Sequence, residues 1–233
     1  MKTINYLKIA VFFGIIIVLG ACGRSKKSAT VNSQQNGEVY NPDGIELVYV
    51  EGAGNTKGFY IGKYLVTQEQ WQAIMGSNPS DFEGNNLPVE NVSWNNTQEF
   101  FAKLNARTGR NYRLSTEAEW EFAARGGTAD SFCAGGCKYS GSNTTESIGW
   151  FDENSNDSTQ PVGTKQPNEL GIYDMSGNLW ELCLDLYDGG SEIHVRGGCW
   201  ASPADDCNID RWYKNSPTDS NRYLGFRVAL LVD

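Results

Sequence analysis

The sequence predicts an α+β domain in which most residues lie in irregular structure. Two short runs of β type open the body of the chain, and three helix patterns follow in its first half. From Thr128 onward the chain is dense in Gly, Asn and Ser, which is typical of turns and loops. A small sheet with about three helices and long connections is the fold class that fits these observations.

The strand runs are residues 46–50 and 58–65, where aromatic and β-branched side chains come close to alternation. Each helix pattern begins after a Ser or Thr that can cap its first turn, and each ends at glycine. The expected helices are 68–75 after Thr67, 94–107 after Ser93, and a third after Thr116 that stops at Gly126. Glu119 gives the third helix the spacing of a capping box.

The first residues predict export and lipid attachment. A basic start with Lys2 and Lys8 precedes an apolar run at 9–19, which is too short for a stable membrane span, and small residues lead to Cys22. This order resembles a bacterial lipoprotein signal, with cleavage before Cys22 and lipid on that cysteine; a simple secretory signal and an uncleaved anchor are the alternatives. We expect a signal peptide at 1–21, a flexible polar tether at 22–43 and one domain at 44–233.

The expected location is the bacterial cell envelope, with the protein held by its lipid on the outer membrane or the cell surface. The leaflet that carries the anchor is left open. The formal net charge is −9 and no basic cluster is present in the sequence, which argues against a nucleic-acid partner.

Export also predicts an oxidising environment, in which disulfides form. With Cys22 assigned to lipid, five cysteines remain: Cys133, Cys137, Cys183, Cys199 and Cys207. Cys133 and Cys137 are close enough to pair with each other, or each pairs elsewhere, and one of the five is left over. We expect at least one disulfide and leave its connectivity open.

The stretch GIYDMSGNLWELCLD, residues 171–185, suggests a calcium site. Asp174 and Glu181 are carboxylates on either side of a turn, and Gly177 and Leu179 between them offer backbone carbonyls. Calcium takes oxygen ligands of these kinds in flexible cages. The alternative is a turn followed by a strand with solvated carboxylates, and spacing alone favours that alternative.

The C-terminal loop 199–224 has the composition of a binding surface. It combines Trp and Tyr side chains with Ser, Asp and Asn, a mixture that suits adaptable recognition. An ordinary irregular loop is an equally good explanation of composition alone. The candidate ligand-binding residues are Ser202, Asp205, Asp206, Asn208, Asp210, Trp212, Tyr213, Asn215 and Tyr223.

Six motifs, in this order, resemble those of the formylglycine-generating enzyme (sulfatase-modifying factor) family: FYIGKYLVTQEQW, LPVENVSW, YRLSTEAEWEFAARGG, GIYDMSGNLWE, RGGCW and LGFRV. The similarity covers residues 46–232, although the glycine-rich opening of many members is shortened here to VEGAGNTKG. The resemblance implies a variant of the C-type lectin fold, with a small twisted sheet, a few helices and long loops. It also places family calcium ligands at Asp174, Gly177, Leu179 and Glu181, which strengthens the calcium hypothesis.

Enzymes of this family oxidise a substrate cysteine to formylglycine with oxygen and with Cu(I) held by two cysteines, which correspond to Ser202 and Cys207 here. A serine hydroxyl is a poor ligand for Cu(I), which prefers thiolates. The neighbouring Cys199 is either a substitute ligand or a disulfide partner, and we favour the disulfide in an oxidising compartment. Another branch of the family uses a histidine-bound iron, and the single histidine, His194, excludes a three-histidine site within this chain.

The C-terminal stretch also resembles the variable proteins of diversity-generating retroelements, which share this fold and diversify residues between a Gly-Gly-Ser-Trp-like start and a Gly-Phe-Arg end. The resulting hypothesis is a non-catalytic, lipid-anchored surface protein that binds a protein or glycan through residues 199–224. One alternative is a copper oxidase acting on exported sulfatases, with Cys199 and Cys207 as ligands. A structural subunit of a cell-envelope complex is the other.

Overall fold

The computed structural model of the chain describes residues 34–54, 56–127 and 136–232. Residues 34–233 form one compact unit. The predicted signal peptide and the predicted lipidation site, Cys22, lie outside the described residues, so both stay predictions.

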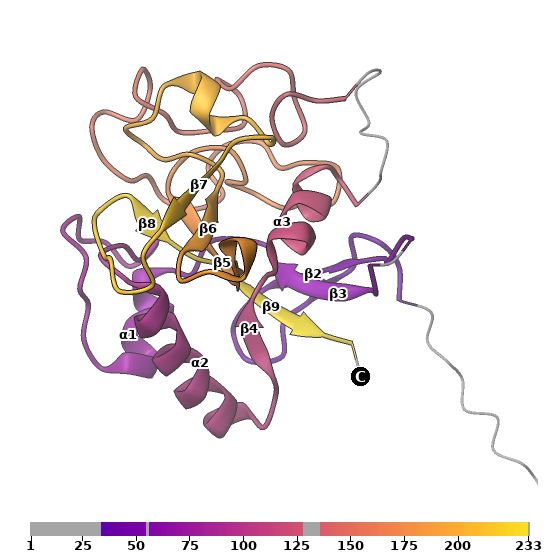
Figure 1. The fold of residues 1–233 in the computed structure, drawn as a ribbon, viewed down its shortest axis with the longest axis vertical. Coiled ribbons are helices and arrows are strands. Elements are labelled where there is room, and N and C mark those ends of the chain that lie inside the picture. The colour runs from indigo at the N-terminus through magenta and orange to yellow at the C-terminus, as the bar shows by residue number, and fades with distance from the viewer. Residues whose placement is uncertain (1–33, 55, 128–135, 233) are drawn as a thin grey trace, which may run out of the picture. The chain divides into compact units, whose positions relative to one another are not determined.

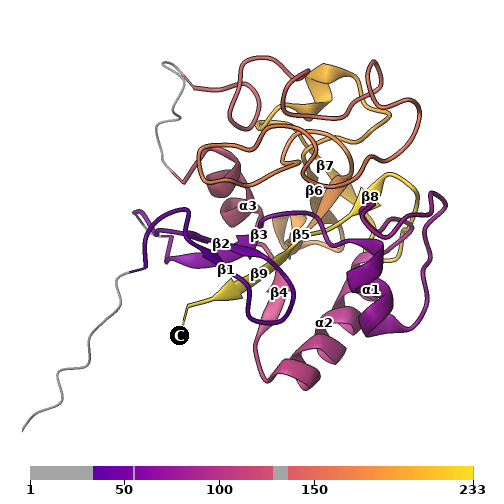
Figure 2. The same cartoon turned by 180° about the vertical axis from the view of Figure 1, so that it is seen from behind.

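The first of two small sheets brings the two ends of the described chain together. Its strands are antiparallel and lie in the order β1-β2-β3-β9-β4. The C-terminal strand β9 lies between β3 and β4, as Figures 1 and 2 show. The bounds are β1 Val39–Tyr40, β2 Leu47–Val50, β3 Phe59–Gly62, β4 Tyr112–Leu114 and β9 Val228–Leu231.

The second sheet carries the C-terminal loop, and its order is β7-β6-β5-β8. β5 pairs antiparallel with β6 and parallel with β8, while β7 pairs antiparallel with β6 and forms the edge of the sheet. The bounds are β5 Trp180–Leu186, β6 Ile193–Arg196, β7 Trp212–Asn215 and β8 Leu224–Gly225. Two short 3₁₀ turns, η1 Tyr187–Gly189 and η2 Ala204–Cys207, belong to the same region.

All three predicted helices are confirmed, together with their caps. They are α1 Gln68–Met75, α2 Trp94–Thr108 and α3 Glu117–Ala124. In each, the side chain of the Ser or Thr before the first turn accepts a hydrogen bond from the N3 backbone N–H, and the N3 side chain accepts one from the backbone N–H of that Ser or Thr. Glycines in the left-handed region end α1 and α2, whereas α3 ends at Arg125.

An aromatic cluster fixes α1 and α2 against the segment that leads into β9. Trp71 of α1 stacks on Phe100 of α2 with ring centroids 5.3 Å apart, and Phe226 meets both rings edge-on. Each ring is buried. Edge and stacked contacts of this kind add to the free energy gained by burying the rings.

A buried ion pair joins the two sheets. Arg227, just before β9, donates to the Glu181 carboxylate of β5 from Nε at 2.6 Å and from Nη2 at 2.5 Å. Both side chains have zero exposure. Arg227 Nη1 also donates to the Gly62 carbonyl of β3 at 2.9 Å, and the Trp120 indole N–H of α3 donates to Glu181 at 2.9 Å.

The predicted tether is too long at its C-terminal end. The polar composition of residues 34–43 suggested a free chain, yet β1 pairs with β2, and the Gly37 N–H donates to the Tyr49 carbonyl at 2.8 Å. Main-chain hydrogen bonds order this segment with few apolar side chains. The predicted loop-rich region is confirmed, since the described residues between α3 and β5 form no helix or strand beyond an isolated bridge.

The expected disulfide at Cys199 is wrong for the described part of the chain. Cys183, Cys199 and Cys207 are buried free thiols, and burial raises the pKa of each. Cys133 lies outside the described residues, so the possible pairing of Cys133 with Cys137 stays a prediction.

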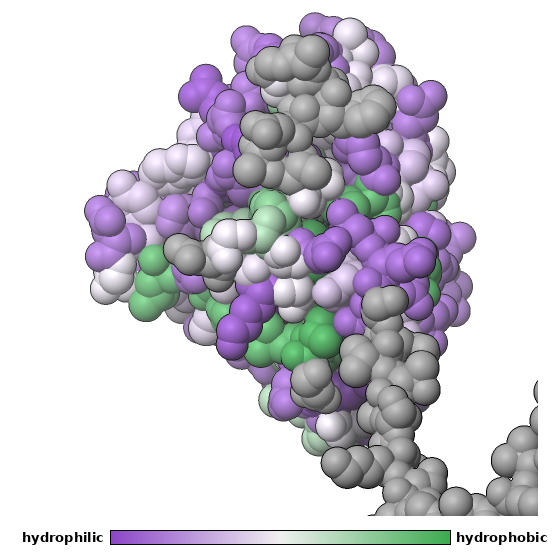
Figure 3. Space-filling model, turned by 90° about the vertical axis from the view of Figure 1, so that its right-hand side faces the viewer, coloured by the Kyte–Doolittle hydropathy of each residue, from purple (hydrophilic) through white to green (hydrophobic). Residues whose placement is uncertain are grey.

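None of the helices in the described residues is long and apolar enough to span a membrane. Figure 3 shows the side of the unit that carries β2, β3 and the C-terminal strand, where small hydrophobic areas lie within a mostly hydrophilic surface. The exposed apolar side chains of β1 and the C-terminus include Val39, Leu231 and Val232.

Candidate functional site: the C-terminal pocket

Loop 199–224 begins with a turn that requires glycine. Gly197 and Gly198 have φ of 94° and 77°, and a Cβ on Gly198 would lie 2.6 Å from the Cys207 sulfur. Ser202 then closes a tight turn: its N–H donates to the Cys199 carbonyl at 3.0 Å, and the Cys199 N–H donates to Ser202 Oγ at 3.1 Å. Ser202 therefore holds the backbone of this turn.

The loop and the second sheet line an open, shallow pocket of about 470 Å³, which we call the C-terminal pocket. Five predicted ligand-binding residues line it: Ser202, Asp206, Tyr213, Asn215 and Tyr223. Two further lining residues, Trp180 and Val195, precede loop 199–224 and are not part of the predicted binding surface. The pocket thus combines aromatic rings with a few polar groups, as ligand sites commonly do.

The pairing of the strands explains why Trp180 and Val195 line the pocket although they lie outside the predicted loop. Paired residues of neighbouring strands share a face; the β5–β8 pairing puts Trp180 opposite Leu224, and the β6–β7 pairing puts Val195 opposite Tyr213. The Trp180 and Tyr213 rings meet edge-to-face with centroids 5.1 Å apart. The β-rich stretch from Trp180 was recognisable in the sequence, but its pairing with β8 was not.

Trp212 and Tyr213 were predicted together, and the structure separates them. They are adjacent on the edge strand β7, so their side chains leave opposite faces of the sheet. Tyr213 lines the C-terminal pocket, while the Trp212 ring packs against Tyr187 and His194 at centroid distances of 5.1 Å and 5.3 Å. Trp212 is exposed but does not line the pocket.

The other predicted residues outside the pocket make local contacts. Asp205 bonds to Lys138 Nζ at 2.6 Å, and Asp210 pairs with Arg125. The Asn208 side chain accepts a bond from the Asp210 N–H at 2.8 Å, which shapes the turn before β7. These three residues order the loop, and none of them lines the pocket.

Asp206 is the carboxylate of the C-terminal pocket, and its pairing is incomplete. Its Oδ1 accepts from the Tyr213 hydroxyl at 3.3 Å and lies 3.7 Å from Arg211 Nε, and its side chain is 23% exposed. Both contacts are long for a charged acceptor. Lys214 also lines the pocket, but its Nζ is bound to Glu192 at 2.8 Å and lies over the Tyr187 ring.

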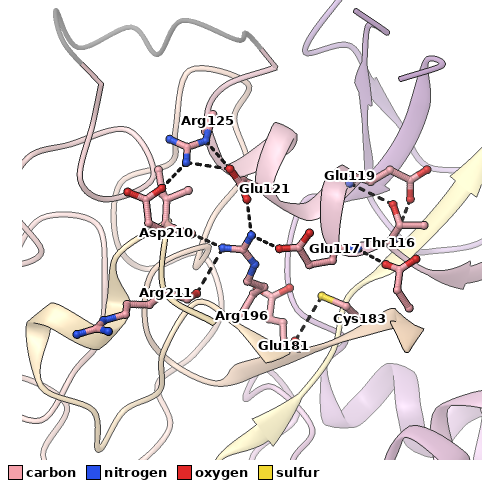
Figure 4. Close-up of polar contacts among 12 residues, drawn as sticks. Thr116, Glu117, Glu119, Glu121, Arg125, Glu181, Cys183, Arg196, Asp210 and Arg211 are labelled. Atoms are coloured by element: carbon pink, nitrogen blue, oxygen red, sulfur yellow. Dashed lines mark hydrogen bonds and ion pairs between the residues drawn. The ribbon is translucent and has the colours of Figure 1, made fainter. Parts of the chain in front are cut away.

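Arg196, at the end of β6, anchors the loop from beneath. Figure 4 shows its guanidinium between Glu117 and Glu121 of α3 and the loop backbone. Nη1 donates to the Ile209 carbonyl at 2.5 Å and to the Arg211 carbonyl at 3.4 Å. The side chain is almost fully buried, so helix α3, strand β6 and the loop are held by one cation.

The Cys199 thiol in the pocket lining and the neighbouring Cys207 thiol are poorly suited to bind copper as they stand. Burial is the main cause that raises the pKa of Cys199 and of Cys207, and the nearby Cys199 raises the pKa of Cys207 further. A thiol binds Cu(I) after losing its proton. The Cys199 sulfur instead lies 3.3 Å from the Ser202 hydroxyl.

The predicted calcium residues fit a cation only in part. The Glu181 carboxylate is already neutralised by Arg227 and also accepts from Trp120, so this side chain does not fit the predicted ligand role. Asp174 fits better: it is buried, Oδ2 accepts from the Gly163 N–H at 2.8 Å, and Oδ1 has no partner among the described residues. The Gly177 carbonyl accepts from the Leu179 N–H at 3.0 Å and keeps a second lone pair.

Comparisons with known proteins place the chain in one family. Residues 35–231 match the family described as the sulfatase-modifying factor enzyme 1-like domain. The chaperone protein LppX of Paenibacillus barcinonensis is 34% identical over 65% of this chain and 72% of its own, and the mouse inactive C-alpha-formylglycine-generating enzyme 2 is 33% identical over 68% and 54%. The chain therefore spans little more than half the length of the mouse relative.

Among solved structures, Treponema denticola variable protein 1 superposes with a TM-score of 0.69 and 28% identity, covering 84% of this chain and 99% of that one. This likeness agrees with the two small sheets, the three helices and the long loops described above. With the family match over nearly all of the described residues, the chain belongs to the sulfatase-modifying factor (formylglycine-generating enzyme) family.

Proposed function

We propose that this protein is a non-catalytic, lipid-anchored binding protein of the bacterial envelope that holds a protein or glycan ligand in the C-terminal pocket. The observation that carries the proposal is the pocket itself. Aromatic rings and polar side chains from the loop and from β5 converge there, and Ser202, which the resemblance aligns with a copper ligand of the family's enzymes, is among them. Lipidation at Cys22 and a tether from residue 23 to 33 complete the proposal for the envelope location.

Adjacent residues on β7 provide a matched test. We expect Tyr213→Ala combined with Tyr223→Ala to reduce ligand binding at least tenfold, because buried aromatic anchors carry much of the binding free energy at such surfaces. Trp212→Ala, one residue away on the opposite face, is the control and is expected to bind like wild type. The binding of each fluorescently labelled variant to glycan arrays and to intact cells is measured and compared with that of wild type.

The opposite ranking, with Trp212→Ala weakened and the tyrosine variant unchanged, would move the binding surface to the other face of β7. Equal loss in both variants with a fall in melting temperature would reflect damage to the edge strand. Circular dichroism of each variant separates that case.

The copper oxidase remains the second candidate, because Cys199 and Cys207 are close enough to influence each other. Loading the reduced protein with Cu(I) and offering a Cys-x-Pro-x-Arg peptide tests it. Stoichiometric copper and formylglycine in the peptide would replace the binding proposal with the enzymatic one.

We further propose that Asp174 takes part in a structural calcium site, with Gly177 and Leu179 carbonyls but without Glu181. Two buried carboxylates, Asp174 and Glu181, share one buried guanidinium, so negative charge is left over. The Thr159 hydroxyl is also buried without a partner among the described residues, and the following Gln160–Gly163 segment bonds to Asn178 and Asp174. Unsatisfied oxygens are what a hard cation takes as ligands.

In the presence of a chelator, stability is expected to fall as pH rises from about 4 to about 6. Burial raises the pKa of Asp174 to about 6. A carboxyl with a raised pKa stabilises the fold while protonated, below its unfolded pKa of about 3.9, and loses that contribution as pH rises through the folded value. The loss amounts to about 3 kcal/mol for a shift of this size, measured by urea unfolding at each pH.

Adding calcium at pH 7 is expected to raise the free energy of unfolding of wild type but not that of Asp174→Asn. The variant is also expected to lose the dependence of stability on pH between about 4 and about 6. Asp152→Asn, an exposed carboxylate nearby, serves as the control. A wild-type melting temperature that is the same in calcium and in chelator would remove the calcium site.

A further inference from the structure

The charges around the C-terminal pocket are unevenly satisfied. Two lysines of the described residues beside the loop are already paired: Lys138 with Asp205 at 2.6 Å and Lys214 with Glu192 at 2.8 Å. Asp206, by contrast, has only the long contacts to Arg211 and the Tyr213 hydroxyl. The lining of the pocket therefore presents a carboxylate whose one cationic contact among the described residues is the long one to Arg211, at 3.7 Å.

The walls around this carboxylate are aromatic. Trp180, Tyr213 and Tyr223 all line the pocket. Aromatic faces attract cations, and an ammonium or guanidinium near several rings gains more when a carboxylate is within reach. A contact between a cation and aromatic rings is already present in the same loop: the guanidinium carbon of Arg222 lies 5.4 Å from the ring centroids of both Trp200 and Tyr223.

We infer that the C-terminal pocket recognises a cationic side chain, lysine or arginine, presented by a partner protein. This inference rests on the proposed function and names its ligand chemistry. The alkyl stem of the side chain would pack on Trp180 and Tyr213, and its charged head would reach Asp206. Asn215, Asn221 and Ser202 supply acceptors for the remaining donors.

A neutral glycan fits these observations less well. Sugars also stack on aromatic rings, but they bring no charge to balance Asp206. The open edge of β7 leaves room for the chain that carries the side chain.

The test uses small probes with the full-length protein in detergent. N-acetyl-lysine methylamide and N-acetyl-arginine methylamide are titrated beside N-acetyl-norleucine methylamide, which keeps the apolar stem without the charge. Nuclear magnetic resonance shifts of the Trp180 indole report on the pocket. We expect saturable binding of the charged probes, at least tenfold tighter than norleucine and weakened several-fold by raising salt from 50 to 500 mM.

Asp206→Asn keeps the shape of the pocket and removes its charge, so it is expected to weaken the lysine probe about tenfold. Asp205→Asn is the matched control, because this neighbouring carboxylate is bound to Lys138 outside the pocket, and its affinity should stay within twofold of wild type. Cadaverine, a free diamine, separates a general amine site from one that also reads the backbone; tighter binding of cadaverine than of the lysine probe would overturn recognition of a protein side chain.

Equal binding of norleucine, no binding of either charged probe, or saturable binding of a methyl glycoside in their place would each overturn the inference. The proposed function fails separately. If the Tyr213 and Tyr223 double variant loses cell-surface binding while the charged probes do not bind, the inference fails and the proposed function stands, with the pocket binding another ligand class. If the double variant binds cells like wild type, the proposed function fails.

Discussion

Replacing Arg227 with methionine is expected to lower the free energy of unfolding by about 3–5 kcal/mol. The substitution leaves the Glu181 carboxylate fully buried, with the Trp120 indole N–H as its remaining donor. It also removes the donors to the Gly62 and Tyr173 carbonyls. Domains of this size are stable by only about 5–15 kcal/mol, so urea unfolding followed by tryptophan fluorescence should show a large shift of the midpoint.

The double variant Glu181→Leu with Arg227→Met is expected to lose less than Arg227→Met alone, because no charge is then left buried without a partner. Lys103→Met provides the control, since it removes an exposed pair with Glu99 and should change stability by less than about 0.5 kcal/mol. An Arg227→Met protein as stable as this control would contradict the importance of the buried pair.

The second large effect is expected from Arg196→Met, at about 2–3 kcal/mol. The carbonyls of Ile209 and Arg211 lose their donor, and Glu117 and Glu121 lose their shared cation. The cost is lower than at Arg227 because the two glutamates are 26% and 34% exposed and can turn to water. Urea unfolding measures the loss.

This variant should also affect function, because a loosened loop must be ordered again when ligand binds. We expect faster amide exchange at residues 208–211 and weaker binding in the C-terminal pocket. Arg125→Met is the comparison: it removes the more exposed contacts to Glu121 and Asp210 and should leave the loop backbone protected. Unchanged exchange in Arg196→Met would show that other contacts order the loop.

The parts of the fold that follow from local chemistry could be predicted. Thr67, Ser93 and Thr116 bond to the first turn of their own helices, so the caps are readable from neighbouring residues alone. The composition of loop 199–224 also predicts a surface of aromatic and polar side chains, because exposed loops favour such residues.

Features that depend on distant partners could not be predicted. The sequence predicts Glu181 as a metal ligand, but in the structure its carboxylate is neutralised by Arg227, which lies far along the chain. Trp212 and Tyr213 are indistinguishable by composition, and only the register of β7 on β6 assigns one to the pocket and the other to the opposite face. Residues 34–43 are ordered by backbone pairing with β2, which leaves little trace in side-chain pattern.

The two buried arginines stand at the two ends of the segment that builds the C-terminal pocket, Arg196 before it and Arg227 after it. The hydrogen-bond donors of each arginine are satisfied mainly by groups that precede this segment, in α3, β3 and β5. Substitutions among the solvent-facing side chains between them therefore leave both anchors intact. A scaffold built in this way can acquire new ligand preferences through changes in one stretch of sequence without having to evolve a new way to fold.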